Sequence, residues 1–330
     1  MIVGLIDVDS HNFPNLALMK LSSYWKKQGS KVEFARPQTH YDRIYVSKVF
    51  TQSIEPDFKQ YNASEWFFGG SGYDLTTVLP DEIEHSFPDY TLYPQFKYAL
   101  GFLTRGCPRM NHTFCITPKK DGCRSRKVAD LSEFWNGQSH ILLLDQNILA
   151  CPDANDLLQQ LVDSGASVEF NGGLDIRFLN EQNIELFRQM KVIDYHFAWD
   201  DPKENLFPKF QQLKDSGIVE PKRCGVYVLT NYWSTIQEDL NRIYHLRSLG
   251  FSPFVMIFDK QKYVDEHGHW LPDVGERFSQ EQLIHFKTCQ HMQRWCNHRA
   301  IQQTVADFND YERYRNWIQK GSKVPKQERT

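Results

Sequence analysis

The segment "ALGFLTRGCPRMNHTFC", residues 99–115, joins an apolar run of strand length to a basic, polar loop that holds two cysteines. The run predicts a β-strand over Ala99–Thr104. Cys107 and Cys115 in the loop, followed by Cys123, form the only compact group among seven cysteines. Thiolates bind zinc and iron–sulfur clusters, so the spacing leaves two interpretations open, a metal site and unrelated thiols.

Six apolar runs of strand length predict six parallel strands, because stretches of helical period separate each run from the next. After Ala99–Thr104, the runs are Ile141–Asp145, Val168–Asn171, Tyr195–Asp200, Gly225–Thr230 and Pro253–Asp259. Glycines are placed to end four helices: Gly29, Gly165, Gly217 and Gly250. Six units are too few for a closed barrel of eight, so this part of the chain predicts a partial (β/α)6 barrel with its helices outside.

A smaller α/β layer precedes these runs. Its predicted elements are strand Ile2–Asp7, helix Asn15–Gln28, strands Val32–Ala35 and Ile44–Val49, and the segment Trp66–Gly72. A linker with two prolines, residues 79–90, separates this layer from the predicted barrel. We therefore place three domains at residues 1–92, 93–275 and 276–330.

The C-terminal part predicts two helices, Ser279–His298 and Thr304–Gln319, with Trp295, Phe308 and Tyr311 packed inward. Two S/T-x-x-Q sequences mark helix starts: Ser234 with Gln237 and Ser279 with Gln282. The mixture of arginine and aromatic residues in these helices also leaves open a surface for a nucleic-acid or peptide substrate. The tail that follows is polar and predicts disorder.

The composition is that of a folded protein without a strong overall charge. The chain has 330 residues, 41% hydrophobic and 24% charged, with a formal net charge of -3. The overall charge gives no indication of binding to nucleic acid or to an acidic membrane surface. A local basic groove is an alternative that the overall charge leaves open. The N-terminus lacks a basic signal-peptide region, and no run approaches the roughly 18 apolar residues of a membrane span. We expect a cytoplasmic protein without a membrane partner. Four scattered cysteines are expected to be buried, reduced thiols: Cys151, Cys224, Cys289 and Cys296.

Polar side chains follow the C-terminal ends of the predicted barrel strands, where the active sites of parallel α/β barrels lie. The candidate binding residues are Asp145, Asn147, Gly173, Asp175, Arg177, Asp200, Asn231 and Tyr232. The segment "NGGLDIR", residues 171–177, adds two glycines that permit close backbone approach to a ligand, next to a carboxylate and a guanidinium. For any one of these residues, an N-cap or turn role is the alternative interpretation.

In its combination of segments, the sequence resembles the radical S-adenosylmethionine enzymes that carry an N-terminal Rossmann-like, cobalamin-binding-like domain. The segments that carry the resemblance are "PNLALMKLSSYWKKQGSKVEF", "FFGGSGYD", "YALGFLTRGCPR", "KVADLSEFW", "ILLLDQNILACPD", "GLDIR", "FAWDDPKE", "VYVLTNY" and "FVMIFD". The resemblance implies a partial (β/α)6 barrel in which three cysteines of a C-x3-C-x2-C loop hold a 4Fe-4S cluster. It also implies that the open iron binds S-adenosylmethionine. One electron, from a donor such as flavodoxin or ferredoxin, then cleaves that molecule to a 5′-deoxyadenosyl radical that abstracts hydrogen from a substrate.

The cysteine loop departs from this motif at its centre. The resemblance assigns Cys107 and Cys115 as outer ligands and places Phe114 beside the adenine. No cysteine occupies the middle position, and the segment is one residue longer than the motif. Three interpretations of the third ligand are open: Cys123, one of His112 and Asn111, or a cluster that is lost or altered. The resemblance assigns the candidate residues at the strand ends to S-adenosylmethionine or to the substrate cavity.

The resemblance also raises cobalamin as a cofactor. Base-off binding uses a D-x-H-x-x-G motif, of which Asp9 and His11 supply the first part, but the glycine is absent, which counts against cobalamin. We expect a radical S-adenosylmethionine enzyme with an unidentified substrate. The alternatives are a non-catalytic binding or regulatory protein on the same fold that has lost its cluster, and a structural zinc module built on the cysteine loop.

Overall fold

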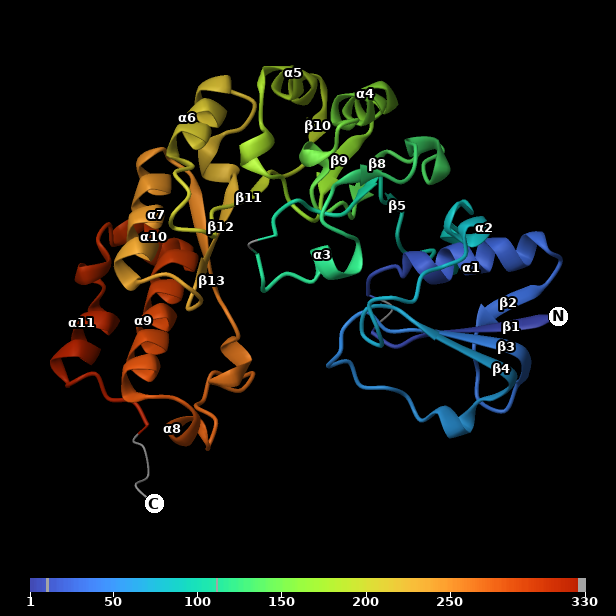
Figure 1. Ribbon diagram of the computed structural model, residues 1–330, viewed down its shortest axis with the longest axis horizontal. Coiled ribbons are helices and arrows are strands. Elements are labelled where there is room, and N and C mark those ends of the chain that lie inside the picture. The colour runs from blue at the N-terminus through green and yellow to red at the C-terminus, as the bar shows by residue number, and fades with distance from the viewer. Residues whose placement is uncertain (10–11, 111, 326–330) are drawn as a thin grey trace. The chain divides into compact units, whose positions relative to one another are not determined.

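The structure is a computed structural model that describes residues 1–9, 12–110 and 112–325 (Figure 1). It is an α/β protein whose three larger sheets are parallel. His11, Asn111 and the last five residues of the tail, for which the sequence makes predictions, lie outside the described residues. Within those ranges, no helix combines the length and apolar character needed to cross a membrane.

The chain divides into two compact units. The first consists of Met1–Gly173 and Asn180–Ile193, and the second of Leu174–Leu179 and Asp194–Thr330. The first unit holds the predicted N-terminal layer and the first three predicted barrel strands. The second unit holds the other three strands and the C-terminal helices.

Four parallel strands form the first sheet of the first unit, in the order β2-β1-β3-β4. The elements are β1 Ile2–Asp7, α1 Leu16–Lys27, β2 Lys31–Phe34, β3 His40–Ser47, β4 Asn62–Gly69 and α2 Asp81–Glu84. Both helices lie on one side of the sheet (Figure 1). Val3 and Leu5 of β1 pack there against Leu18 and Leu21 of α1, because strand residues two apart and helix residues three apart share a face.

A second parallel sheet of the first unit has the order β10-β9-β8-β5. Its strands and their helices are β5 Ala99–Gly101, β8 His140–Leu143, α4 Ala154–Ser164, β9 Ser167–Phe170, α5 Glu181–Gln189 and β10 Lys191–Val192. Leu100 and Leu142 of this sheet share one hydrophobic cluster with Leu16 and Met19 of α1. The two sheets of the first unit therefore have a common core.

The second unit is built on a parallel sheet in the order β11-β12-β13. Its elements are β11 His196–Ala198, α6 Phe207–Ser216, β12 Gly225–Thr230, α7 Ile236–Ser248, β13 Ser252–Ile257, α8 Val274–Arg277, α9 Gln280–Asn297, α10 Arg299–Thr304 and α11 Glu312–Gln319. Val226 and Val255 are fully buried, whereas Tyr227, Phe254 and Met256 are each more than one third exposed. Because successive strand residues point to opposite faces, one face of this sheet is covered and the other is partly open.

The six predicted barrel strands are confirmed as elements, each beginning within about one residue of its predicted start. Hydrogen bonds join them in groups of three, β5-β8-β9 and β11-β12-β13. The glycine signals are also confirmed: Gly165 and Gly217 are left-handed C-caps of α4 and α6, with φ of 64° and 70°. The prediction for the four scattered cysteines is confirmed as well, since all four are buried free thiols.

Two predicted helix boundaries are wrong. Helix α7 begins after the N-cap Thr235, whose capping box uses Glu238, and not after Ser234 with Gln237. The helix predicted over Thr304–Gln319 is interrupted between α10 and α11, because Asp307 caps a short 3-10 turn that buries Phe308. Trp295, Phe308 and Tyr311 are buried as predicted, and Ser279 with Gln282 forms the predicted capping box of α9.

Candidate functional site

The cysteine loop is a hairpin that follows β5. Strands β6 (Thr104–Arg105) and β7 (Arg126–Lys127) form its antiparallel base, and α3 (Thr117–Lys120) lies between them in the chain. Beyond this base, the backbone N–H of Cys107 donates to the carbonyl oxygen of Gly122 at 3.2 Å. The pairing therefore brings the backbone of Cys107 beside the residue that precedes Cys123.

The three thiols of this hairpin differ in their surroundings. The Cys107 side chain is 8% exposed, and its sulfur accepts a hydrogen bond from Asn147 Nδ2 at 3.4 Å. The Cys115 thiol is half-buried and donates to Thr117 Oγ1 at 3.3 Å, and Cys123 is exposed. All three are free thiols, so the donor chemistry of the hairpin fits an iron–sulfur cluster. The described His, Cys, Asp and Glu side chains nevertheless form no group of three or more arranged to hold a metal ion.

Asp145, just after the C-terminal end of β8, binds the backbone that leads into this hairpin. Its carboxylate accepts the backbone N–H groups of Leu103 and Thr104 at 3.0 and 2.7 Å, and the Thr104 hydroxyl at 2.7 Å. The side chain is 3% exposed. Each carboxylate oxygen is thus bonded to the chain just before the cysteines, so Asp145 positions the loop.

Asp145 makes the free energy of unfolding depend on pH. Burial raises the pKa of this carboxyl to about 6, whereas an unfolded chain gives a pKa of about 3.9. Between about pH 4 and 6 the group keeps its proton in the folded chain and loses it in the unfolded chain, so stability falls as pH rises through this window. Two pKa units correspond to about 3 kcal/mol.

Asp145→Asn removes this titration. The difference in free energy of unfolding between wild type and variant is expected to change by roughly 3 kcal/mol from about pH 4 to 7, measured by urea denaturation. A difference that stays constant with pH would contradict the assignment. Because both proteins share every other titrating group, the comparison isolates this one.

The two glycines of "NGGLDIR" are each required, for separate structural reasons. A Cβ on Gly172 would lie 2.0 Å from the carbonyl oxygen of Asp145, so the ends of β8 and β9 approach too closely for any side chain. Gly173 has a φ of 78°, in the left-handed region that favours glycine. The close approach at Gly172 is therefore between two strands of the sheet.

Gly172→Ala is expected to destabilise the chain by about 1–3 kcal/mol or more, because the atom in the way belongs to the backbone and only a shift of a strand end makes room. Gly69→Ala is the matched control, since Gly69 ends β4 and a Cβ there meets only Thr77 Cγ2, at 3.7 Å, an ordinary van der Waals contact. Neither Gly69 nor Gly172 has a left-handed φ, so the two variants differ in the clash. Thermal unfolding of both variants measures the difference, and equal losses would contradict the clash.

Asp175 and Arg177 lie together in the second unit. The guanidinium donates from Nε and Nη2 to the two Asp175 oxygens at 2.8 and 2.6 Å, and from Nη1 to Glu204 at 2.8 Å. Asp175 also accepts the backbone N–H of Arg177 and so caps the 3-10 turn Ile176–Phe178. The N-cap role that was the alternative interpretation applies to Asp175, and the pair forms a two-bond salt bridge.

Residues that follow the three strands of the second unit also contact one another. Asn231 follows β12 with a left-handed φ of 61°, and its Nδ2 donates to the carbonyl oxygen of Phe258 at 3.1 Å. The ring of Tyr232 contacts the rings of Trp233 and Phe258 at centroid distances of 4.6 and 4.5 Å. Trp233 Nε1 in turn donates to the carbonyl oxygen of Asp200 at 3.4 Å. Three predicted site residues therefore share one aromatic edge.

Arg242 is a residue of this edge that the sequence did not reveal. It lies on α7, is 2% exposed and donates to the carbonyl oxygens of Trp199 and Asp200 at the end of β11. It also donates to the carbonyl oxygen of Leu229 in β12 and pairs with Asp239. In sequence, Asp239 and Arg242 have the spacing of an ordinary surface ion pair on a helix, so no local signal marks their burial.

Phe114 and the alternative ligand His112 lie against each other. Their ring centroids are 5.0 Å apart with an interplanar angle of 28°, which is a stacked arrangement. His112 is 6% exposed, and Phe114 is half-buried. The structure thus gives Phe114 a ring partner within its own loop.

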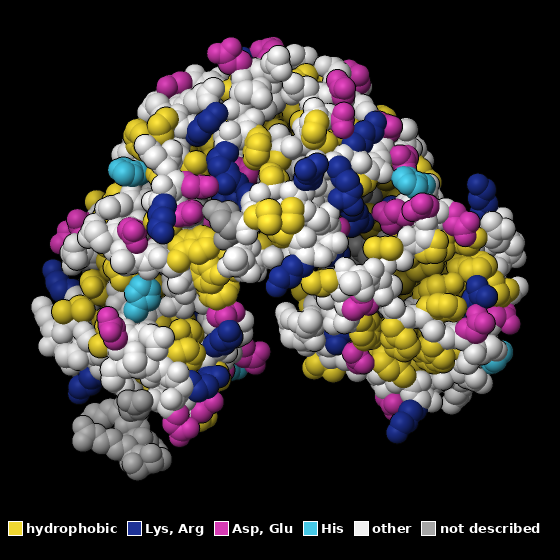
Figure 2. Space-filling model, viewed as in Figure 1, with side chains coloured by type: hydrophobic (Ala, Val, Ile, Leu, Met, Phe, Trp, Pro, Cys, Tyr) yellow, Lys and Arg dark blue, Asp and Glu magenta, His cyan; other side chains and the backbone are white. Residues whose placement is uncertain are grey.

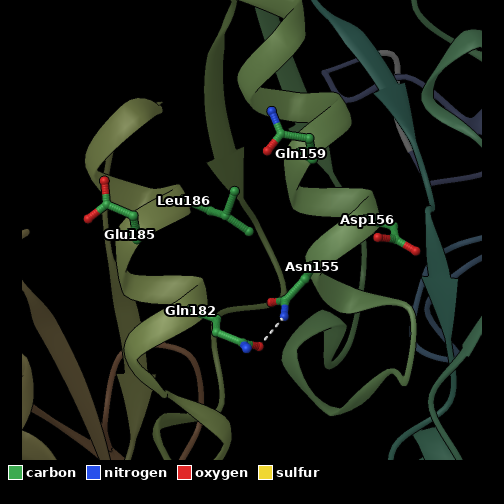
Figure 3. Close-up of a pocket in the computed structure, with 6 residues that line it drawn as sticks. All are labelled: Asn155, Asp156, Gln159, Gln182, Glu185 and Leu186. Carbon is green, nitrogen blue, oxygen red and sulfur yellow. Dashed lines mark hydrogen bonds between the residues drawn. The ribbon is translucent and has the colours of Figure 1, made fainter.

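A groove of about 460 Å³ lies between α4 and α5 (Figure 3). Its lining residues are Asn155, Asp156, Gln159, Gln182, Glu185 and Leu186. Asn155 Nδ2 donates to Gln182 Oε1 at 2.9 Å, so a hydrogen bond links the two helices at the groove. None of the predicted site residues lines it.

No protein-family model and no curated protein matches this sequence. The geometry places Asp145, Asn147 and Cys107 together in the first unit. In the second unit it forms two groups, Asp175 with Arg177, and the aromatic edge of Asp200, Asn231 and Tyr232. The chemistry of these groups is the basis for the function.

Proposed function

We propose that this chain is a radical S-adenosylmethionine enzyme whose 4Fe-4S cluster is held by Cys107, Cys115 and Cys123. The observation that carries the proposal is the hydrogen bond from Cys107 N to Gly122 O, which brings two of the three cysteines to the same end of one hairpin. All three cysteines are free thiols, as cluster ligands must be. When bound, the cluster supplies the electron that cleaves S-adenosylmethionine.

The residues around the hairpin support this assignment by fixing its first cysteine. Asp145 binds the backbone of Leu103 and Thr104, and Asn147 donates an N–H to the Cys107 sulfur. Hydrogen bonds to cluster sulfur atoms are one of the ways in which a protein sets a reduction potential. A partial (β/α)6 barrel after a Rossmann-like domain is part of the proposal, since the six strands occur in the predicted order and pair in parallel within each group of three.

Anaerobic purification with iron and sulfide tests the proposal. A brown protein with about four iron atoms per chain, which forms 5′-deoxyadenosine from S-adenosylmethionine on reduction, is the expected result. A brown protein that forms no 5′-deoxyadenosine would contradict the enzyme but not the cluster. A colourless protein with one tightly bound zinc would favour the structural zinc module instead.

A binding or regulatory protein without a cluster is the second candidate, and one observation favours it. The Cys115 thiol donates a hydrogen bond to Thr117 Oγ1 within the loop, so it has a protein partner without any metal. On this alternative, the hairpin would keep its fold without metal. Reconstitution that yields a colourless, metal-free and fully folded chain is the result that would establish it.

A further inference from the structure

The segment from Arg105 to Lys127, which we call the basic hairpin, concentrates positive charge in a chain that is acidic overall. It contains one acidic residue, Asp121, whereas the whole chain has a formal charge of -3. Its seven basic residues are Arg105, Arg109, Lys119, Lys120, Arg124, Arg126 and Lys127. Figure 2 shows dark-blue side chains on the part of the surface around α3. A solvent-exposed face normally carries both acidic and basic side chains, so this excess of positive charge calls for an explanation.

Contacts within the fold account for only part of the excess. The ladder of β6 and β7 sets Arg105 opposite Arg126, and like charges at opposed positions destabilise an antiparallel pair. Asp121 is the single carboxylate within the hairpin, and it accepts from Arg105 Nη1 at 3.2 Å and from Gln146 Nε2 at 2.9 Å. Arg126 reaches only its carbonyl oxygen, at 2.6 Å. Arg105 also pairs with Glu84 at 3.3 Å, and Lys127 pairs with Asp130 at 2.6 Å, so carboxylates compensate most of the positive charge at the base of the hairpin.

Three further cations of the hairpin are available to a ligand. Lys119, Lys120 and Arg124 are exposed, and among the residues that the structure describes none of the three has an ion pair or a side-chain hydrogen bond. Lys119 and Lys120 end α3, and Arg124 precedes β7. The free charges thus sit on the same short hairpin as the paired ones.

We propose that the basic hairpin binds the phosphodiester backbone of a nucleic acid. Lysine and arginine are the side chains that neutralise phosphates, and interfaces with nucleic acid are much more positive than those between proteins. Two of the three cations without an ion pair, Lys119 and Lys120, are lysines, a residue depleted at protein–protein interfaces, which favours nucleic acid over an acidic protein. Met110 and Ile116, 69% and 52% exposed, add apolar surface beside these charges. The binding does not depend on a cluster and goes beyond the proposed function.

Fluorescence anisotropy with the full chain tests this binding. The probes are a labelled single-stranded RNA and a single-stranded DNA of the same sequence, over a range of salt concentrations. Comparable affinities for both are expected, because backbone phosphates are common to them. The triple variant Lys119→Ala, Lys120→Ala and Arg124→Ala is expected to bind at least about tenfold more weakly at low salt. The slope of log K against log salt should fall by about 0.7 for each lost phosphate contact.

A second triple variant is the matched control. Lys27→Ala, Lys59→Ala and Arg315→Ala remove the same charge from exposed positions outside the hairpin and are expected to change the affinity by less than about twofold. A charge-preserving variant, with Lys119→Arg, Lys120→Arg and Arg124→Lys, is expected to bind like the wild type. Circular dichroism spectra that match the wild type show that each variant is folded.

Four outcomes would overturn the proposal. The wild type could fail to bind either probe at low salt, or it could bind only one of the two. The hairpin variant could bind as the control variant does. Finally, polyglutamate could displace the RNA as well as unlabelled RNA does at equal charge, which would identify an acidic protein surface as the partner of the basic hairpin.

Discussion

Replacing Arg242 with methionine is expected to lower the free energy of unfolding by about 3–5 kcal/mol, the range for removing one partner of a buried ion pair. The guanidinium pairs with Asp239, which is fully buried. It also donates to the carbonyl oxygens of Trp199, Asp200 and Leu229 at 2.6, 2.5 and 2.9 Å. Methionine has a similar length but no donor, so a buried carboxylate and three carbonyl groups lose this partner at once.

Arg188→Met on α5 is the matched control. Arg188 pairs with Glu185 at the same i,i+3 spacing as Arg242 with Asp239, but the two side chains are 49% and 58% exposed. The loss of the Arg188–Glu185 pair is expected to lower the free energy of unfolding by less than about 1 kcal/mol. Urea denaturation followed by circular dichroism measures both variants. Similar losses in the two would show that burial does not strengthen the Arg242 pair.

A second substitution separates the buried charge from the lost hydrogen bonds. Asp239→Leu added to Arg242→Met removes the carboxylate that the single variant leaves buried without its cation. The double variant is therefore expected to be more stable than the single one. If the double variant is the less stable of the two, the carbonyl hydrogen bonds of Arg242, and not its charge, dominate its contribution.

The elements of the fold could be predicted because their signals are local. Gly165 and Gly217 end α4 and α6 in the left-handed conformation that glycine favours, and the apolar run that predicts each of the six strands begins within about one residue of that strand. The grouping of these strands into sheets depends on hydrogen bonds between distant segments. The pattern of one chain does not contain that information, so strand identity was predicted better than sheet composition.

The positions of the candidate site residues after the strands could be predicted, but their contacts could not. Asp145 and the segment "NGGLDIR", which contains Gly172, were selected because they follow the ends of predicted strands, and both do follow strands. Their partners are Leu103 and Thr104 for the carboxylate, and the backbone of Asp145 itself for the glycine. These contacts depend on the register of β5 with β8, whose paired residues lie 42 residues apart in the chain, and of β8 with β9, whose paired residues lie 27 apart, which no local motif records.

The largest functional effect is expected from Cys123→Ala. If Cys123 is the third ligand, the reconstituted variant should lose most of the roughly four iron atoms per chain that the proposal expects, together with its brown colour. Cys151→Ala is the matched control, because Cys151 is a free thiol of the same unit that is 5% exposed and lies outside the hairpin. The control should keep its iron, and iron assays on both proteins measure the difference.

The same assay separates the three interpretations of the third ligand. Cys107→Ala should lose the iron whenever a cluster is held by this hairpin, because Cys107 is an outer ligand in each such arrangement. If Cys123→Ala keeps its iron and His112→Ala loses it, the ligand is the imidazole that now stacks on Phe114. If both variants keep their iron, Asn111 is the candidate ligand that remains. If the wild type takes up no iron, neither ligand set is correct. The hairpin would then be a metal-free structure held by Asp145 and by the Cys107–Gly122 hydrogen bond.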